Sequence, residues 1–364
     1  MNNISIIGIG KLGLSFALNL ERKGYNVIGV DVNLNYVDQI NNKTLKSDEP
    51  KVEEYLSSSK NFIATTDISK ALANDLIFIV VATPSLEGGG YDHSHIDDVI
   101  KSFRALGKQP TKKYLIISST VMPGYCSTLK YIKEYNYEVA YNPEFIAQGT
   151  IIKDQCNPDI ILIGSTSEEA KNLIEEIYKR LCDNKPSICK MSLMEAEITK
   201  IALNCFLTTK IAYANMVGDI ALRTGCNPDV ILDAIGKDSR IGGKYLKYGF
   251  GFGGPCFPRD NRAFASFCHT NYINAHISKA TDESNQSHLK NQILEFKHSH
   301  DFGESVVIEG VAFKKDSTII EESQQLKFAV ELANEGYGVT IKDCASVIDQ
   351  VQKIYGHRFK YVVS

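Results

Sequence analysis

The chain has 364 residues, of which 43% are hydrophobic and 23% charged, and its formal net charge is −3 at pH 7. This length predicts two or three domains, and the slightly negative charge argues against a surface for nucleic acid or anionic membranes. The longest apolar run, residues 76–82, is far too short to span a membrane, and no signal peptide precedes the first strand, so we expect a cytoplasmic protein. The nine cysteines show neither C-x-x-C pairs nor metal-ligand spacing, so we expect reduced thiols and no metal site.

The first predicted elements are a strand, a glycine turn and a helix. An apolar run at residues 4–7 opens directly into the turn, and a helical pattern follows to Lys23. The turn reads Gly8, Ile9, Gly10, Lys11, Leu12, Gly13. Such a triplet is weak evidence alone, but after a strand and before a helix it is typical of a dinucleotide-binding turn. A second strand, residues 26–30, ends at Asp31, whose carboxylate can accept hydrogen bonds from an adenosine ribose, so NAD is favoured over NADP.

Further apolar strands alternate with helices. The predicted elements are helices at 36–42, at 51–57 and from about 66, and strands at 62–64, 76–82 and 115–118. Apolar strands separated by helices indicate a parallel sheet covered on both faces, as in a Rossmann-like domain. Thr83 and Thr120 follow two of these strands at the carboxyl edge, where such sheets bind ligands, although either threonine could equally cap a turn.

A long helix is predicted between residues 192 and 225. Ser192 and Glu195 form a capping-box pattern, and no proline interrupts the following residues. A helix of about 32 residues is on the order of 48 Å long. Because one small domain does not need that length, we expect the helix to link two lobes and to offer an apolar face to a second copy. Lys200 and Asn204 share one of its faces, which in isolation is a common surface pair.

The glycine-rich stretch at residues 240–260 leads to a single thiol. Cys256 lies between Pro255 and Phe257, directly after the last glycines. A cysteine in such a turn is most often a small hydrophobic residue, but a glycine-rich backbone can also approach a ligand closely and present a nucleophile rigidly.

The C-terminal part predicts a second, smaller α/β unit. The expected elements are a helix that begins at Asn227-Pro228 and, after the cysteine loop, a helical stretch that includes Asn285 and ends near His298. A strand at 306–311, a helix at 323–334 and a strand at 339–341 follow. Lys314 follows the first of these strands, where a lysine is usually solvated.

Together these motifs resemble the nucleotide-sugar 6-dehydrogenases, the UDP-glucose and GDP-mannose dehydrogenase family. The family signature at the catalytic cysteine is close to R-I-G, a spacer and G-x-G-F-G-G-x-C-x-P-K-D, and here residues 240–242 and 251–260 match it with Arg259 in place of lysine. Pro255 before the cysteine is similar to the UDP-glucose branch, since the N-acetylhexosamine branch commonly has histidine there. Residues 197–204 resemble E-x-x-K-x-x-x-N, residues 141–149 resemble P-E-F-L-R-E-G, and Ala312-Phe313-Lys314 resembles G-x-A-F-K.

The resemblance implies a role for each matching residue. As catalytic residues it implies Cys256, Lys200, Asn204, Asp260, Thr120 and Glu144. As contacts to NAD it implies Gly8, Gly10, Lys11, Leu12, Gly13, Asp31, Thr83, Thr120, Gln148 and Arg259. As contacts to the nucleotide sugar it implies Glu144, Phe145, Gln148, Lys200, Asn204, Arg240, Tyr245, Gly249, Gly253 and Lys314. In the family's homodimer, Arg240 would serve the sugar of the neighbouring subunit.

Besides Arg259, the sequence departs from the family pattern near residue 148, at residue 321 and after Asp343. Gln148 stands where the family has glutamate and Ala147 where it has arginine. Glutamine cannot serve as a base, so Glu144 becomes the candidate to activate the hydrolytic water. Glu321 replaces an arginine of the family, and few residues follow Asp343, so we expect a C-terminal lobe shortened by a strand–helix unit, with altered nucleotide affinity or selectivity.

The resemblance predicts an NAD-binding Rossmann-like domain at 1–191, a central helical dimerisation domain with the cysteine loop at 192–290, and a nucleotide-sugar-binding α/β domain at 291–364. The expected reaction is the four-electron oxidation of a nucleotide sugar, first of all UDP-glucose, at C6 to the uronic acid, through a thiohemiacetal and a thioester on Cys256. Two alternatives stay open: a hydroxyacid dehydrogenase that performs a single oxidation, and a nucleotide-sugar-binding protein without activity.

Overall fold

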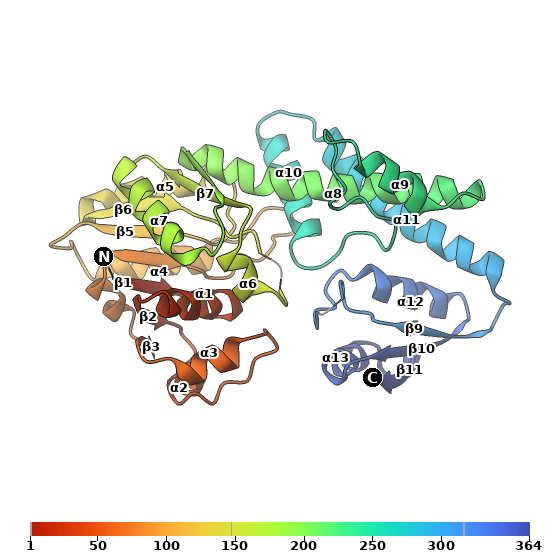
Figure 1. Ribbon diagram of the computed structural model, residues 1–364, viewed down its shortest axis with the longest axis horizontal. Helices are drawn as coiled ribbons and strands as arrows, with labels where there is room; N and C mark the ends of the chain where they lie inside the picture. Colours follow the sequence, from red (N-terminus) through yellow and green to blue (C-terminus); the bar gives the residue numbers. More distant parts are fainter. Residues whose placement is uncertain (1, 147, 316) are drawn as a thin grey trace. The chain divides into compact units, whose positions relative to one another are not determined.

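Figure 1 shows the computed structural model of the chain, which describes residues 2–146, 148–315 and 317–364. The chain divides into two compact units, residues 1–200 and 201–364, and each contains a sheet of its own. The division into three domains stays a prediction.

The first unit is built on a sheet of eight strands within the described residues. Its order is β3-β2-β1-β4-β5-β6-β7-β8, with parallel neighbours throughout apart from the antiparallel pair of β6 and β7. The strands are β1 (Asn3–Ile7), β2 (Asn26–Val30), β3 (Phe62–Thr65), β4 (Leu76–Ile79), β5 (Lys113–Ile117), β6 (Tyr137–Tyr141), β7 (Ile160–Ser165) and β8 (Ser187–Met191). The helices are α1 (Lys11–Arg22), α2 (Leu34–Asn41), α3 (Val52–Ser58), α4 (Ser94–Ala105), α5 (Tyr125–Thr128), α6 (Ile151–Cys156) and α7 (Glu168–Leu181), with 3-10 helices η1 (Ile68–Ala73) and η2 (Leu129–Tyr135).

The inner strands of this sheet carry apolar side chains on both faces. In β4, Leu76 and Phe78 belong to one hydrophobic core, while Ile77 and Ile79 belong to the other. Helices α1 and α7 contribute to the first core and α4 to the second. The parallel sheet covered on both faces, predicted from uninterrupted apolar strands, is therefore confirmed.

Two predicted elements of this unit differ from the structure. The helix expected from about residue 66 is the 3-10 helix η1. The strand expected at 76–82 ends at Ile79. It is shorter because its neighbour β1 ends at Ile7, where Gly8 turns the chain away with φ +86° and the ladder between the two strands stops.

Helix α8 (Leu193–Arg223) begins in the first unit and continues in the second. The Ser192 N–H donates to the Glu195 carboxylate at 2.8 Å, and the Glu195 N–H donates to the Ser192 hydroxyl at 3.4 Å. These reciprocal bonds are the predicted capping box, which satisfies donors that the first helical turn leaves unpaired. The helix has 31 residues, close to the predicted length.

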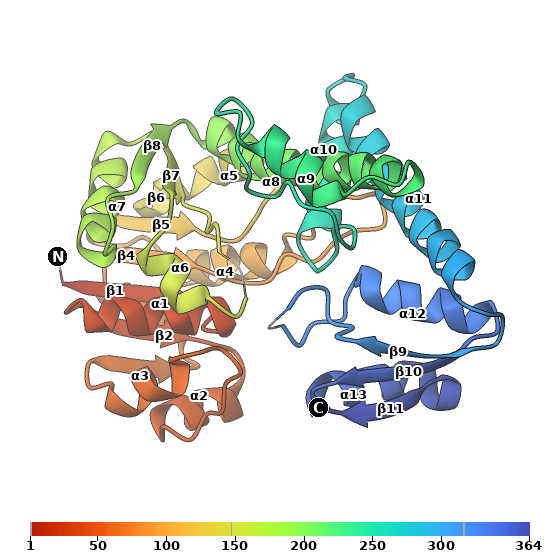
Figure 2. The same ribbon diagram turned by 45° about the vertical axis from the view of Figure 1, so that its right-hand side comes forward.

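The second unit contains a group of helices and a small sheet. Figures 1 and 2 show α9 (Pro228–Gly236), α10 (Phe257–Thr270) and α11 (His276–Ser299) gathered around α8. The sheet is parallel, with order β11-β10-β9 in the part of the chain that the structure describes. Its elements are β9 (Ser305–Glu309), α12 (Gln324–Asn334), β10 (Gly338–Asp343), α13 (Ala345–Tyr355), the 3-10 helix η3 (Gly356–Arg358) and β11 (Lys360–Val363). The predicted second α/β unit is confirmed. Within the described residues, no helix is both long and apolar enough for a membrane span.

Candidate active site

The turn between β1 and α1 uses its glycines for different reasons. Gly8 has φ +86°, which glycine adopts without strain. A Cβ on Gly13 would lie 2.0 Å from the Gly8 carbonyl oxygen, whereas a Cβ on Gly10 would meet nothing within 4 Å. Space therefore lies in front of the backbone where α1 begins with Lys11 and Leu12, and the first turn carries no acidic side chain. This arrangement fits the pyrophosphate of a dinucleotide, because a helix N-terminus attracts anions.

Three further predicted cofactor contacts follow the ends of β2, β4 and β5. Asp31 comes directly after β2 and accepts a hydrogen bond from the Asn33 N–H at 3.0 Å. The buried Thr83 donates its hydroxyl to the Thr120 carbonyl oxygen at 2.8 Å. Since β2, β1, β4 and β5 are parallel neighbours, their carboxyl ends share one edge of the sheet. Asp31, Thr83 and Thr120 therefore lie along the edge that carries the glycine turn.

Glu144, Phe145 and Lys200 lie together in the first unit. The Lys200 ammonium donates to the Glu144 carbonyl oxygen at 2.6 Å and lies 4.4 Å from the centre of the Phe145 ring. Burial raises the pKa of Glu144 to about 7, against the opposing effects of Lys200 and the Tyr178 hydroxyl. A carboxyl group that titrates near neutral pH suits a general base. Gln148 is partly buried in the turn that follows, and Ala147 lies outside the described residues.

Cys256 lies at the N-terminal end of α10, where the residue is exposed. Its carbonyl oxygen accepts a hydrogen bond from the Asp260 N–H at 2.8 Å, which closes the first turn of the helix. The start of a helix favours negative charge, and a thiol reacts as its thiolate. The fold therefore presents this sulfur in a position that suits a nucleophile.

Asp260 lies one helical turn after Cys256 and connects two other predicted site residues. Its carboxylate belongs to a residue only 1% exposed. Asn204 Nδ2 of α8 donates to one carboxylate oxygen at 2.6 Å, and Arg259 Nε donates to the other at 3.1 Å. Asp260 therefore fixes both Asn204 and Arg259 beside the start of α10.

The backbone before Cys256 is held by α11, through a residue that the sequence did not single out. The Asn285 side chain accepts from the Phe252 N–H and donates to the Phe252 carbonyl oxygen, both at 2.9 Å. A Cβ on Gly251 would lie 2.2 Å from the Asn285 side-chain oxygen, and one on Gly253 would lie 2.4 Å from the Glu322 carbonyl oxygen. At these two glycines the close approach is to the protein's own atoms.

Three predicted sugar contacts lie earlier in the same loop. Arg240 has a side chain that is 86% exposed and pairs with Asp238 at 2.7 Å. Tyr245 has φ +62° and is itself exposed. Gly249 donates its N–H to the Asn215 side-chain oxygen at 3.1 Å. The Arg240 side chain is therefore exposed to solvent, while Gly249 is hydrogen-bonded to α8.

Lys314 and Glu321 lie in the segment after β9. The Lys314 ammonium is 5.8 Å from the centre of the Phe313 ring, and a Cβ on Gly254 would come within 2.4 Å of that ring. Glu321 is exposed, and its carbonyl oxygen accepts from the Gly254 N–H at 3.1 Å. The segment therefore supports the cysteine loop through its backbone, independently of the side chain at 321.

Comparison with known proteins decides the family. The UDP-glucose/GDP-mannose dehydrogenase family matches with its NAD binding domain over residues 2–182 and its central domain over residues 194–287. The UDP-glucose 6-dehydrogenase of Rickettsia felis is 31% identical over 344 residues, which cover 92% of this chain and 76% of that protein. The GDP-mannose 6-dehydrogenase of Pseudomonas savastanoi pv. phaseolicola is 30% identical over 358 residues, which cover 93% of this chain and 80% of that protein. The chain belongs to this family.

Solved structures agree with the assignment to the UDP-glucose/GDP-mannose dehydrogenase family. A UDP-glucose dehydrogenase from Pyrobaculum islandicum has a TM-score of 0.90 at 31% identity, covering 100% of this chain and 86% of that one. A ternary complex of GDP-mannose dehydrogenase from Pseudomonas aeruginosa has a TM-score of 0.63 at 29% identity, and the match covers 100% of this chain and 88% of that one. The chain is therefore an NAD-dependent oxidoreductase with NAD as its cofactor. The predicted family, fold class and cofactor are confirmed.

Proposed function

We propose that this family member oxidises UDP-glucose at C6 to UDP-glucuronate in two successive steps. The exposed Cys256 at the start of α10, with Asp260 one turn later bound through both oxygens, is the observation that carries the proposal. UDP-glucose is favoured because the relatives from Rickettsia felis and Pyrobaculum islandicum are named for it. NAD, when bound, supplies the acceptor for the hydride removed in each oxidation.

Cys256 acts between the two oxidations. The first removes two electrons from the C6 alcohol and gives an aldehyde. The Cys256 thiolate adds to the aldehyde carbon and forms a thiohemiacetal, and the second two-electron oxidation converts it to a thioester. Water then cleaves the carbon–sulfur bond, so that the carboxylate leaves and the thiol is restored. From the addition to the aldehyde until hydrolysis, the oxidised sugar stays covalently attached to Cys256.

The surrounding side chains handle charge and protons. The Lys200 ammonium and the Asn204 amide stabilise negative charge on the C6 oxygen. Thr120 and Asp260 position the hydrolytic water, and Glu144 accepts its proton, because its carboxyl group titrates near neutral pH. Gln148 orients the bound substrate and cofactor through hydrogen bonds and takes no proton, since an amide is not a base.

The same proposal includes a homodimer through α8. Large apolar side chains recur along one face of this helix at spacings of seven, three and four residues. They are Phe206 (65% exposed), Tyr213 (49%), Met216 (45%) and Ile220 (57%). An apolar stripe of this kind suits a second copy of the chain. In that dimer the outward Arg240 binds the nucleotide sugar of the partner, as its guanidinium donates in pairs to a diphosphate. The cytoplasmic location stays a prediction.

The decisive experiment counts NADH. Purified protein given UDP-glucose and excess NAD should form two NADH per sugar. Cys256→Ala should lower formation of the acid by roughly a thousandfold or more. Cys226→Ala, which removes another exposed thiol, is the matched control and should leave turnover unchanged.

Other outcomes assign other functions. Full turnover by Cys256→Ala with one NADH per substrate would identify a single-oxidation hydroxyacid dehydrogenase. Binding of UDP-glucose without any NADH would contradict the enzymatic proposal. A panel of UDP- and GDP-linked hexoses in the same assay identifies the sugar, because a GDP-mannose 6-dehydrogenase is almost as similar to this chain, at 30% identity.

A further inference from the structure

His288 of α11 lies directly behind the loop that carries the proposed sugar contacts. The residue is 3% exposed. Its Nδ1 lies 2.9 Å from an Asp219 carboxylate oxygen, and its Nε2 lies 2.7 Å from the Gly249 carbonyl oxygen. Both ring nitrogens therefore face oxygen atoms.

Neither of these oxygens can donate a hydrogen bond. A backbone carbonyl carries no hydrogen. Burial opposes ionisation of Asp219, but the hydrogen bonds from His288 and Asn291 outweigh it and hold the pKa of this carboxyl below its ordinary value. Asp219 is therefore a carboxylate at neutral pH. Both contacts of His288 are hydrogen bonds only if both ring nitrogens carry a proton, which makes the ring an imidazolium.

The charged and titratable groups around His288 come from three elements. From α8, Asp219 faces the ring, and Arg223 donates to the Asn291 side-chain oxygen at 2.9 Å. From the loop, Tyr248 donates to Asp219 at 3.2 Å and packs edge-on against the imidazole. On α11, Glu283 lines the adjoining cavity with His288.

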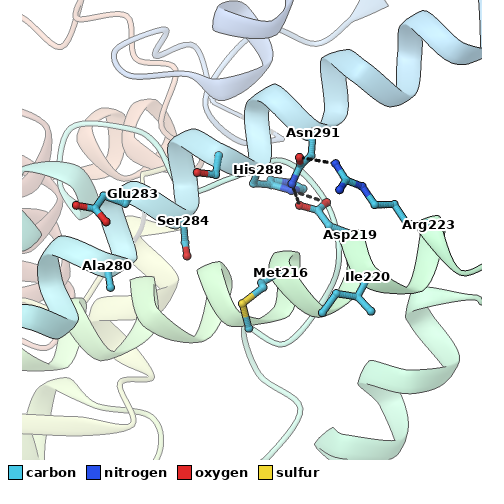
Figure 3. A pocket seen from close by; sticks show the side chains of 10 residues that line it. Met216, Asp219, Ile220, Arg223, Ala280, Glu283, Ser284, His288 and Asn291 are labelled. Carbon is cyan, nitrogen blue, oxygen red and sulfur yellow. Dashed lines mark hydrogen bonds and ion pairs between the residues drawn. The ribbon is translucent and has the colours of Figure 1, made fainter.

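This cavity has a volume of about 400 Å³ and lies between α8 and α11. Figure 3 shows Asp219, His288, Asn291 and Arg223 together at one end of it, joined by hydrogen bonds. Because His288 is among the lining residues, the buried ring borders this cavity on one side.

The contacts of α11 with the loop follow helical spacing. Asn285, His288 and Gln292 lie three and four residues apart and all bind loop backbone: Asn285 at Phe252, the other two at the Gly249 carbonyl oxygen, with Gln292 at 3.3 Å. Asn285 and Gln292 donate from amide groups that keep their hydrogens, whereas His288 donates to Gly249 only when its Nε2 is protonated. Gly249, whose carbonyl oxygen His288 contacts, lies seven residues before Cys256.

We propose that His288 is a positioning residue, and that its doubly protonated ring fastens the loop at residues 245–253 in the conformation that holds the nucleotide sugar. The proposal rests on the proposed function, in which Tyr245, Gly249 and Gly253 contact that sugar. Loss of one proton leaves a ring nitrogen lone pair facing an oxygen, so the ring can keep only one of its two contacts. Affinity for the sugar should therefore fall as the pH rises.

A direct test is ¹⁵N NMR of the full-length protein without substrate. The ring nitrogens of His288, assigned by correlation to the backbone of the wild-type protein, should both show imidazolium shifts at neutral pH. The shift of an unprotonated ring nitrogen at neutral pH would overturn the proposal.

A second test measures order in the loop by hydrogen exchange. His288→Gln should lower the protection of amides in residues 249–253 by about tenfold or more, the effect of losing a hydrogen bond with a charged partner. His298→Gln is the matched control on the same helix, because the exposed His298 bonds to its own helix, at the Leu294 carbonyl oxygen. Equal protection in wild type and His288→Gln would contradict the proposal.

The kinetic arm separates binding from chemistry. The KM for UDP-glucose of the wild type should rise with pH, whereas that of His288→Gln should be about tenfold higher at low pH and insensitive to pH, with kcat little changed. A variant with wild-type KM and pH profile would count against the proposal. Failure of the proposed function would appear instead as absence of NADH in the wild type, and it leaves the NMR and exchange results interpretable.

Discussion

Glu144 is the titratable residue that most constrains the proposed hydrolysis. Burial raises its pKa from 4.5 to about 7, so the carboxylate, which is the basic form, predominates only above neutral pH. The Lys200 ammonium, which donates to the Glu144 carbonyl oxygen, opposes this shift without cancelling it. At the scale of residues, we therefore expect the rate of the proposed thioester hydrolysis to depend on the protonation of this one carboxyl group.

The prediction concerns the pH dependence of that step. Decay of the thioester should accelerate as the pH rises through about 7 and then level off. Glu144→Gln should slow it by roughly a hundredfold or more and remove this limb of the profile. Rapid-quench measurement of the covalent intermediate checks both. Glu134→Gln, at an exposed residue, should behave as the wild type.

Stability gives an independent check on Glu144. Because its pKa is higher in the folded than in the unfolded chain, the folded state binds more protons between pH 4.5 and about 7. Its contribution to stability therefore falls as the pH rises through this window, and the loss is complete above pH 7. Glu144→Gln should lack this decline in urea unfolding, and an unchanged decline would show that another group causes it.

Single residues also mark the limit of sequence-based prediction here. Lys200 and Asn204 could be placed on one helix face from their spacing, but their partners, the Glu144 carbonyl oxygen and the Asp260 carboxylate, could not. Asn285 and His288 gave no signal, because polar residues on a helix look like a solvated face until the loop that they bind is in place.

At the scale of elements, the glycine turn before α1 was predictable and α10 was not. The strand, turn and helix around Gly8 each leave a local pattern, and β1 and β2 match their predicted positions closely. Helix α10 starts immediately after a glycine-rich stretch that reads as loop, although Pro258 in its first turn is a start signal. Strand β7 runs antiparallel to its neighbour β6. No local sequence pattern predicts this direction, because it depends on which strand β7 pairs with.

Two substitutions in the glycine turn before α1 should separate an effect on NAD binding from an effect on the stability of the fold. Gly10→Ala should leave the melting temperature nearly unchanged, since its Cβ meets nothing within 4 Å, but should weaken NAD binding about tenfold or more by filling the space for the pyrophosphate. Gly13→Ala should instead destabilise the fold, because its Cβ would lie 2.0 Å from the Gly8 carbonyl oxygen. Thermal unfolding and NAD titration measure the two effects. Equal NAD affinity in Gly10→Ala would place the pyrophosphate elsewhere.

For the whole molecule, the main prediction is the dimer through α8. Phe206→Asp should raise the dimer dissociation constant roughly thirtyfold or more, because it puts a charge into the apolar stripe. Analytical ultracentrifugation measures this. Ile354→Asp, at an exposed apolar residue of α13, is the control and should leave association unchanged. A wild-type protein that sediments as a monomer at micromolar concentration would refute the dimer.

Helix α8 also limits how this chain can be recombined with its relatives. The boundary between the two compact units falls at residues 200 and 201, inside one continuous helix and between Lys200 and Asn204. A chimaera joined at that boundary would pair a lysine from one parent with an asparagine from another, within a single helical turn. Junctions placed before the cap at Ser192 would instead transfer the helix intact, and such hybrids should express and turn over better than those cut at the boundary.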